Sequence, residues 1–278
     1  MCGVLICLLS ILTSARADPE AGSSDNSGSN AFTGNNWAVI VSTSRYWLNY
    51  RHTANALAVY ATVKRLGFHD SRILLMLPDD MACNGRSSYP GQIFHDSSHS
   101  MNLYSPDIEV DYRGHEVTAD SFLRVLTGRH HPAVPLGKRL QSDAGSNILV
   151  YLTGHGGDEF LKFQDREELL AQELADAVQQ MWDAGRYRKM LLIADTCQAS
   201  TLFQRISAPG VISLASSQKG ESSWAFAHDP DIGLSLMDRF TMQMFDFFRA
   251  HVKPDSSATL GQLLSSFRWV QWGSDWAR

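Results

Sequence analysis

The sequence predicts an α/β fold with a mostly parallel central sheet and helices on both of its faces. Several short runs of Ile, Leu and Val show no alternation with polar residues, as in strands that are buried on both faces of a parallel sheet. Segments with helical spacing of apolar residues lie between these runs. Strands that alternate with helices along a chain are typical of parallel α/β sheets.

The composition is that of an ordinary globular protein. The chain has 278 residues, of which 44% are hydrophobic and 19% are charged, enough for one large domain or two small ones. The formal net charge is −5 and the chain has no basic run. We therefore expect no nucleic-acid surface.

The first 34 residues are predicted to lie outside the fold. Residues 1–17 have an apolar core, Val4 to Leu12, followed by Ala15-Arg16-Ala17, a pattern typical of a signal peptide and its cleavage site. The alternative is a membrane anchor, but a span needs about 20 apolar residues and this run is shorter. Residues 18–34 are rich in Ser, Gly and Asn and are predicted to be a disordered linker. We expect the catalytic domain within residues 35–252.

The elements of this domain are expected in the following order. Strands are predicted at residues 37–43, 72–77, 107–111 (an edge strand), 147–153, 160–163, 190–195 and 210–216. Helices are predicted at residues 50–66, 117–126, 166–183 and 234–252, the first two ended by Gly67 and Gly128. A long polar loop spans residues 78–106. Residues 253–278 form a divergent tail with Trp269, Trp272 and Trp276 and no transmembrane helix.

Two of the buried runs stop at a residue able to do chemistry. Asn147-Ile-Leu-Val-Tyr-Leu-Thr-Gly leads to His155, and Met190-Leu-Leu-Ile-Ala-Asp-Thr leads to Cys197. The loops at the carboxyl ends of adjacent parallel strands share one crevice, where active sites form. We therefore expect His155 and Cys197 within hydrogen-bonding reach, which is the arrangement that a thiol nucleophile needs.

Each of these residues also has a simpler interpretation. Cys197 could be a small buried hydrophobe, although its polar neighbours argue against this. A helix that begins after Cys197 would help to lower the pKa of the thiol. His155 could be a strand-end histidine bonded to backbone, but as a general base it would take the thiol proton and later protonate the leaving amine. The Gly156 amide could help to bind an oxyanion.

Two further features could have a structural role or a functional one. Asp107, Glu109 and Asp111 alternate with apolar residues, so their carboxylates share a face and either bind a cation or protect a solvated edge strand. Cleavage of the signal peptide would remove Cys2 and Cys7 and leave Cys83 and Cys197. We do not expect these two to pair, because Cys197 lies at the proposed catalytic strand end, so Cys83 is an odd thiol. Cys83 then either forms an intermolecular disulfide or is buried and inert.

The motifs at these positions resemble those of the legumain-related cysteine peptidases, which share the caspase-type fold. The resemblance rests first on Tyr151-Leu-Thr-Gly-His155-Gly-Gly and Asp195-Thr-Cys197-Gln. Within this family the closer match is to the catalytic subunits of glycosylphosphatidylinositol (GPI) transamidases. The supporting segments cover residues 35–250 and are Asn36-Trp-Ala-Val-Ile-Val, Asn49-Tyr-Arg-His52, Asp79-Asp-Met-Ala-Cys83-Asn, Val110-Asp-Tyr-Arg113, Phe122-Leu-Arg-Val-Leu-Thr-Gly128 and Leu214-Ala-Ser-Ser-Gln218.

The resemblance implies a site and a reaction. Cys197 would be the nucleophile, His155 its base, Asn49 a third member that orients the site, and Gly156 an oxyanion donor. On sequence grounds Asn49 could equally be a helix N-cap. The enzyme would cleave a C-terminal hydrophobic signal from a proprotein and transfer the new carboxyl, through a Cys thioester, to the ethanolamine amine of a GPI lipid. The alternatives are a legumain-like cysteine endopeptidase and an inactive scaffold subunit.

The resemblance also implies ligands, partners and a compartment. No catalytic cofactor is expected, but a structural Ca2+ would be held by Asp70, the carbonyl of Ile73, Glu109 and Asp111. Cys83 would form a disulfide to another subunit of a membrane-bound transamidase complex. The protein would work on the luminal side of the endoplasmic reticulum, associated with the membrane through that complex.

Overall fold

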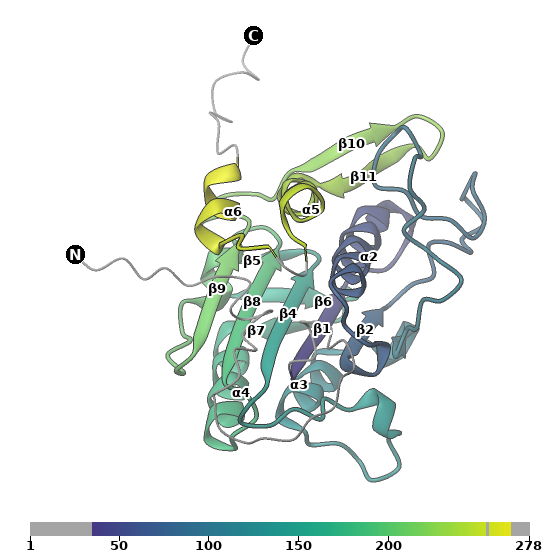
Figure 1. Ribbon diagram of the computed structural model, residues 1–278. Coiled ribbons are helices and arrows are strands. Elements are labelled where there is room, and N and C mark those ends of the chain that lie inside the picture. The colour runs from purple at the N-terminus through teal and green to yellow at the C-terminus, as the bar shows by residue number, and fades with distance from the viewer. Residues whose placement is uncertain (1–34, 254–255, 268–278) are drawn as a thin grey trace, which may run out of the picture.

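A computed structural model describes residues 35–253 and 256–267. Its centre is a six-stranded sheet in the order β3-β2-β1-β4-β8-β9, in which every neighbouring pair is parallel (Figure 1). The strands are β1 (Asn36–Ser42), β2 (Ile73–Leu77), β3 (Tyr112–Arg113), β4 (Asn147–Thr153), β8 (Lys189–Asp195) and β9 (Val211–Ala215). The predicted sheet is therefore confirmed.

Helices cover both faces of this sheet, also as predicted. Successive residues of a strand point to opposite faces. In β1, Ala38 and Ile40 belong to the core under one set of helices, α2 (Tyr50–Arg65), α5 (Arg239–His251) and α6 (Leu260–Ser266). Val39 and Val41 belong to the core under α3 (Ala119–Thr127) and α4 (Ala171–Asp183). Both cores are apolar, which explains why the strands read as unbroken apolar runs.

Two small sheets flank the central one. The antiparallel sheet β5-β6-β7 consists of Gly156–Gly157, Phe160–Phe163 and Glu167–Leu170 and follows directly after β4. The hairpin of β10 (Ala225–Asp229) and β11 (Leu234–Asp238) leads into α5. Short 3-10 helices, η1 (Trp47–Asn49), η2 (Asp70–Arg72), η3 (Gly114–Glu116), η4 (Leu136–Lys138) and η5 (Ala199–Phe203), complete the described elements.

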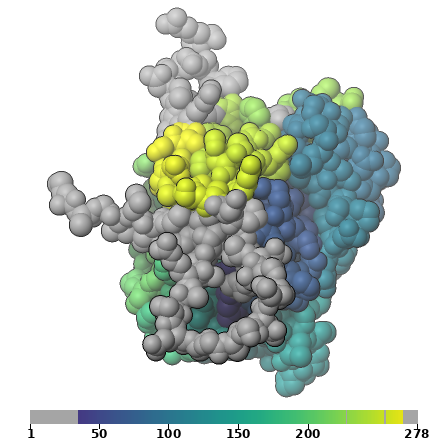
Figure 2. Space-filling model, viewed as in Figure 1, coloured from purple at the N-terminus to yellow at the C-terminus, as the bar shows by residue number. Residues whose placement is uncertain are grey.

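The long loop after β2 packs against the C-terminal helices. Residues 78–106 carry no helix or strand, as predicted. The space-filling view shows this blue segment beside the yellow C-terminal helices on the same side of the molecule (Figure 2). The contact includes the ring of His95, which meets Phe245 of α5 edge-on with centroids 5.2 Å apart.

Three predicted elements were wrong in extent or type. Residues 107–111 form no strand, and the edge strand is instead the two-residue β3. Asp111 explains this, because its Oδ2 accepts a hydrogen bond from Leu75 N at 2.8 Å and its own N–H donates to Leu75 O at 2.9 Å. One side chain thus replaces part of the strand ladder beside β2.

The helix predicted at residues 166–183 begins later, at Ala171. Glu167–Leu170 form β7, which pairs with β6. The Glu173 carboxylate accepts a hydrogen bond from Leu170 N at 2.9 Å, which fixes the start of α4. The helix predicted at residues 234–252 is also shorter, because Leu234–Asp238 form β11 and α5 begins at Arg239. Neither the β10–β11 hairpin nor α6 was predicted.

The described residues cover only part of the two ends of the chain. The signal peptide (residues 1–17), the linker (18–34) and the three tryptophans of the tail lie outside the described residues. Part of the predicted tail is described. Phe267, at the end of α6, stacks on Phe240 of α5, with ring centroids 5.1 Å apart. No helix among the described residues is long and apolar enough to cross a membrane.

Candidate active site

The two chemically active segments leave neighbouring strands at the same level. Thr153 of β4 and Asp195 of β8 are register partners, and His155 and Cys197 each follow two residues later. The segments then stay in contact, because a Cβ built on Gly156 would lie 2.6 Å from Thr196 Oγ1. The juxtaposition expected from the strand ends is therefore confirmed for the two segments. No hydrogen bond joins the Cys197 thiol to His155 in the described part of the chain, so their pairing stays a prediction.

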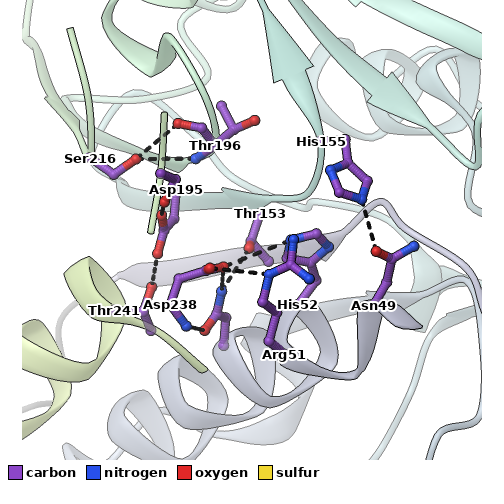
Figure 3. Close-up of polar contacts among 12 residues, drawn as sticks. Asn49, Arg51, His52, Thr153, His155, Asp195, Thr196, Ser216, Asp238 and Thr241 are labelled. Atoms are coloured by element: carbon purple, nitrogen blue, oxygen red, sulfur yellow. Dashed lines mark hydrogen bonds and ion pairs between the residues drawn. The ribbon is translucent and has the colours of Figure 1, made fainter. Parts of the chain in front are cut away.

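His155 is held by Asn49. The distance from His155 Nε2 to Asn49 Oδ1 is 2.8 Å (Figure 3). The Asn49 Nδ2 group donates to the carbonyl of Arg45 at 2.5 Å, so the amide oxygen is left to accept from the ring. His155 Nε2 must then carry the proton and Nδ1 is the free base. The predicted partnership of Asn49 with His155 is thus supported by geometry.

Asn49 does not act as a helix cap. It precedes α2 at the N-cap position, but its side chain makes no capping hydrogen bond. Its side chain is buried, and both ends of the amide are used, by His155 and by Arg45. Asn49 therefore occupies the N-cap position expected from the sequence, but its side chain binds His155 and Arg45 instead of capping the helix.

The turn that carries Arg45 is packed against the glycine before His155. A Cβ on Gly154 would lie only 2.0 Å from Thr43 Oγ1 and 3.2 Å from Ser44 Oγ. Thr43 also donates its backbone N–H to Thr153 O at 2.9 Å. Gly154 therefore allows the ends of β1 and β4 to meet, which places the Arg45 carbonyl where Asn49 needs it.

A buried polar network lies behind His155 (Figure 3). The Asp238 carboxylate accepts hydrogen bonds from Arg51 Nε at 3.2 Å and Asn55 Nδ2 at 2.6 Å, and His52 Nε2 is 3.8 Å away. Asn55 also donates to Thr153 Oγ1 at 3.0 Å. Burial, together with Asp195, raises the pKa of Asp238 to about 7.

This network lowers the basicity of both histidines. Complete burial holds the pKa of His52 well below its usual value, and Arg51 lowers it further. Burial and then Arg51 also lower the pKa of His155. A neutral His155 is the form that can accept a thiol proton.

A second buried carboxylate, Asp195, lies just before Cys197. It accepts hydrogen bonds at 2.6 Å from Ser223 Oγ and Thr241 Oγ1, and Thr241 in turn contacts the Tyr151 hydroxyl at 2.5 Å. Burial raises the pKa of Asp195. Neither Asp195 nor Asp238 was expected from the sequence to have a role. The available signal for a buried polar network was the spacing of Asn49, His52 and Asn55. These polar residues recur every three positions at and after the start of α2, so their side chains lie near one another.

The segment after Cys197 is not the helix that was expected. Gln198 has a left-handed backbone (φ 54°), and the five-residue 3-10 helix η5 follows it. Cys197 itself is half-buried and its thiol is free. Ser216 and Ser217 bind the backbone around it, since Ser216 Oγ accepts from Thr196 N at 3.1 Å and Ser217 Oγ accepts from Ala199 N at 3.0 Å.

Cys83 lies far along the sequence from this site, in the loop after β2. Its thiol is exposed and free, so the interpretation as a buried inert thiol is wrong. Asp80 raises the pKa of the Cys83 thiol. The disulfide to a partner subunit stays a prediction.

The acidic residues expected to hold calcium are only partly gathered. Tyr60 OH donates to Asp70 Oδ1 at 2.8 Å and Lys64 Nζ lies 2.5 Å from Asp70 Oδ2, so Asp70 is already paired with a cation. Burial raises the pKa of Asp111 to about 7. Among the described residues no three His, Cys, Asp or Glu side chains are grouped as metal ligands. Ca2+ held by Asp70, the carbonyl of Ile73, Glu109 and Asp111 stays a prediction.

Two sequence comparisons with known proteins agree on the family of this chain. The sequence model of the peptidase C13 family matches residues 36–268. Proteins named GPI-anchor transamidase are 53% identical over 229 residues in Mus musculus, covering 82% of this chain, and 49% identical over 233 residues in Saccharomyces cerevisiae, covering 84%. A caspase-1 structure from Spodoptera frugiperda matches with a TM-score of 0.48 and 12% identity, over 84% of this chain and 76% of that chain. The chain spans 58% of the length of the mouse relative and 56% of the yeast relative.

Proposed function

The chain belongs to the peptidase C13 family, and from this premise we propose that it is the catalytic subunit of a GPI transamidase. It would cleave a C-terminal hydrophobic signal from a proprotein and transfer the new carboxyl to the ethanolamine amine of a GPI lipid. The observation that carries the proposal is the hydrogen bond of His155 to Asn49, at a strand end next to the one that leads to Cys197.

The first half of the reaction forms a thioester. His155 Nδ1 takes the proton of the Cys197 thiol, and the sulfur attacks the carbonyl carbon of the scissile peptide bond. The carbonyl oxygen becomes an oxyanion, which the backbone amide of Gly156 would stabilise. The C–N bond breaks, the imidazolium gives its proton to the leaving amine, and the acyl group stays on Cys197.

The second half replaces sulfur with nitrogen. The ethanolamine amine of the lipid attacks the thioester carbonyl, and His155 accepts the proton that this amine loses. The C–S bond breaks, and the His155 imidazolium returns its proton to the Cys197 thiolate. An amide is formed in place of the original peptide bond. Asn49 would hold the imidazole in the same tautomer through both halves.

The partners and the compartment form part of this proposal. The exposed, free Cys83 is available for a disulfide to another subunit of the complex. We place the protein on the luminal side of the endoplasmic reticulum, associated with the membrane through that complex.

The second candidate function is hydrolysis, as in a legumain-like endopeptidase. The family description favours it, because a peptidase of this family would form the same thioester and resolve it with water. The products separate the two reactions: transfer leaves an amide of the lipid amine, and hydrolysis leaves a free carboxylate.

The test is complementation of cells that lack the endogenous catalytic subunit, with a GPI-anchored reporter at the cell surface as the readout. Wild type should restore display, whereas Cys197→Ala and His155→Ala should not. His131→Ala, which changes an exposed histidine, is the matched control and should restore display. Equal rescue by Cys197→Ala would show a scaffold. Reporter secreted with a free carboxylate would show a hydrolase.

A further inference from the structure

We propose that Thr201 is a positioning residue that fixes His155 relative to Cys197. The proposal rests on the catalytic roles proposed above for these two residues. Thr201 lies in η5, beyond Cys197, and is 2% exposed. Its hydroxyl contacts both the segment that carries His155 and the turn that carries Cys197.

The contacts to the His155 segment come from the β5–β6 turn. Glu159 N donates to Thr201 Oγ1 at 2.8 Å, and Thr201 Oγ1 lies 3.3 Å from the carbonyl of Gly157. Gly157 is two residues after His155. Glu159 has a left-handed backbone (φ 65°), which is uncommon for a residue with a side chain.

The contact to the Cys197 turn is made through Gln198. Thr201 Oγ1 donates to the Gln198 carbonyl at 2.8 Å, and Thr201 N donates to the same oxygen at 2.9 Å. Gln198 directly follows Cys197 and also has a left-handed backbone (φ 54°). One buried hydroxyl therefore joins two strained turns. Its oxygen accepts a hydrogen bond from Glu159 N of the β5–β6 turn, and its proton is donated to the Gln198 carbonyl of the turn after Cys197.

Other contacts also join the two regions, but they involve exposed side chains or lie before the two turns. Gln204 Nε2 and Arg205 Nε, just beyond η5, donate to the Glu159 carboxylate at 2.6 and 2.8 Å. Gly154 N donates to Asp195 O at 3.4 Å. Ser216 and Ser217 bind backbone groups on either side of Cys197 and do not contact the His155 segment. The ion pair of Lys219 with Asp158 does join the two regions, at 2.7 Å, but both side chains are exposed. Exposed ion pairs hold geometry weakly.

The simpler interpretation is that Thr201 only stabilises the local turn. The two interpretations differ in what should happen to the dyad when the hydroxyl is lost. If Thr201 sets the spacing of His155 and Cys197, its loss should weaken the transfer of the thiol proton to His155, even in a folded protein. If its role is local, only stability should fall.

The experiment measures the pH dependence of Cys197 alkylation by iodoacetamide in the purified full chain, with each cysteine peptide quantified by mass spectrometry. Wild type should react faster than His155→Ala, because His155 accepts the thiol proton. In Thr201→Val, which keeps the shape and loses the hydroxyl, the profile should shift towards that of His155→Ala. Thr201→Ser, which keeps the hydroxyl, should react as wild type does.

Two controls separate position from stability. Thr62→Val removes a buried hydroxyl that donates to Ala58 O at 2.8 Å in α2, and should lower the melting temperature without moving the profile. The exposed Cys83 should react at the same rate in every variant. We expect Thr201→Val to reduce reporter display in cells by about ten- to a hundredfold, the range that a small misplacement of reacting groups can cause.

Three outcomes would overturn the proposal. A folded Thr201→Val with the wild-type profile and normal reporter display would show that the hydroxyl has only a local role. A Thr201→Ser variant that behaves like His155→Ala would show that the methyl group matters instead, and this comparison remains usable if Thr201→Val does not fold. Identical profiles for wild type and His155→Ala would show that the proposed dyad itself is wrong.

Discussion

The ring of His52 meets the ring of His155 edge-on, with centroids 5.0 Å apart and planes at 82°. His52 belongs to α2 and is buried, so it packs against His155 from the interior of the protein. A proton on His52 would add a positive charge next to Arg51 and His155 in a buried environment, and burial outweighs the Asp238 carboxylate 3.8 Å from His52 Nε2. The fold therefore requires His52 to stay neutral.

This requirement predicts how stability depends on pH. An unfolded histidine titrates near pH 6.5, whereas burial holds the folded pKa of His52 well below that value. As the pH falls through about 6.5, the unfolded chain takes up a proton that the folded chain does not, so the free energy of unfolding falls. The contribution is fully present above this pH and is lost below it.

The variant His52→Gln removes this titration. Between pH 7.5 and 5.5 its melting temperature should fall less than that of wild type. His131→Gln, at an exposed position, should keep the wild-type dependence. Equal slopes for His52→Gln and wild type would show that His52 does not couple folding to protons.

Arg51 predicts a change in the base itself. After burial, the charge of Arg51 is the largest cause of the lowered pKa of His155. Arg51→Gln should raise the pKa of His155, because it removes a positive charge that opposes protonation. Titration of the His155 ring by NMR in the full chain measures this. Arg51→Lys retains the charge and should leave the pKa near its wild-type value, and a rise in Arg51→Lys equal to that in Arg51→Gln would contradict the electrostatic cause.

Removal of the Asn49 side chain should lower the rate of the reaction with little effect on folding. Asn49→Ala leaves His155 Nε2 without its acceptor, so the ring is free to rotate or change tautomer. A lost hydrogen bond to a buried group costs about 1–2 kcal/mol, which corresponds to roughly five- to thirtyfold in rate. Initial rates of reporter attachment should fall by this factor. Asn84→Ala, in the loop after β2, is the control and should leave the rate unchanged. A wild-type rate for Asn49→Ala would show that the hydrogen bond has no part in turnover.

The sequence was sufficient for β1, β2, β4, β8 and β9 of the central sheet because these strands are mostly apolar runs, but it misplaced the edge strand. Strands that are buried on both faces, for example β4 and β8, must be continuous apolar runs, and that pattern is visible without a structure. The position of His155 and Cys197 followed from the same rule, since both come just after these runs. The register of Thr153 with Asp195 then brought the two segments together.

The elements that were missed depend on contacts between residues far apart in the chain. Leu234 to Asp238 has the spacing of a helix, but Asp238 is tied to Arg51 and Asn55, which lie more than 180 residues earlier. Likewise Asn49 opens a helix, and its sequence context alone predicts a cap. Its bond to His155 needs the fold, because the two residues are 106 positions apart. Local patterns cannot reveal such pairs.

Gly154 lies where the ends of β1 and β4 meet. A methyl group at this position would lie 2.0 Å from Thr43 Oγ1, a distance that cannot persist, so the Thr43 side chain must rotate or the ends of the two strands must move apart. The φ of 158° at Gly154 is also strained for a residue with a side chain. Overpacking of this kind costs about 1–3 kcal/mol. Gly154→Ala should therefore lower the free energy of unfolding by this amount in urea denaturation, whereas Gly85→Ala, whose Cβ would meet no atom within 4 Å, should be close to neutral.

The same substitution should also disturb the site, because the chain that leaves β1 carries the Arg45 carbonyl to which Asn49 donates. Thr43→Ala removes the atom that is struck first, so the double variant should recover part of the lost stability and part of the reporter display. A Gly154→Ala protein as stable as Gly85→Ala would show that the strand ends can separate without cost. In that case the position of Asn49 would have to be set from α2 alone.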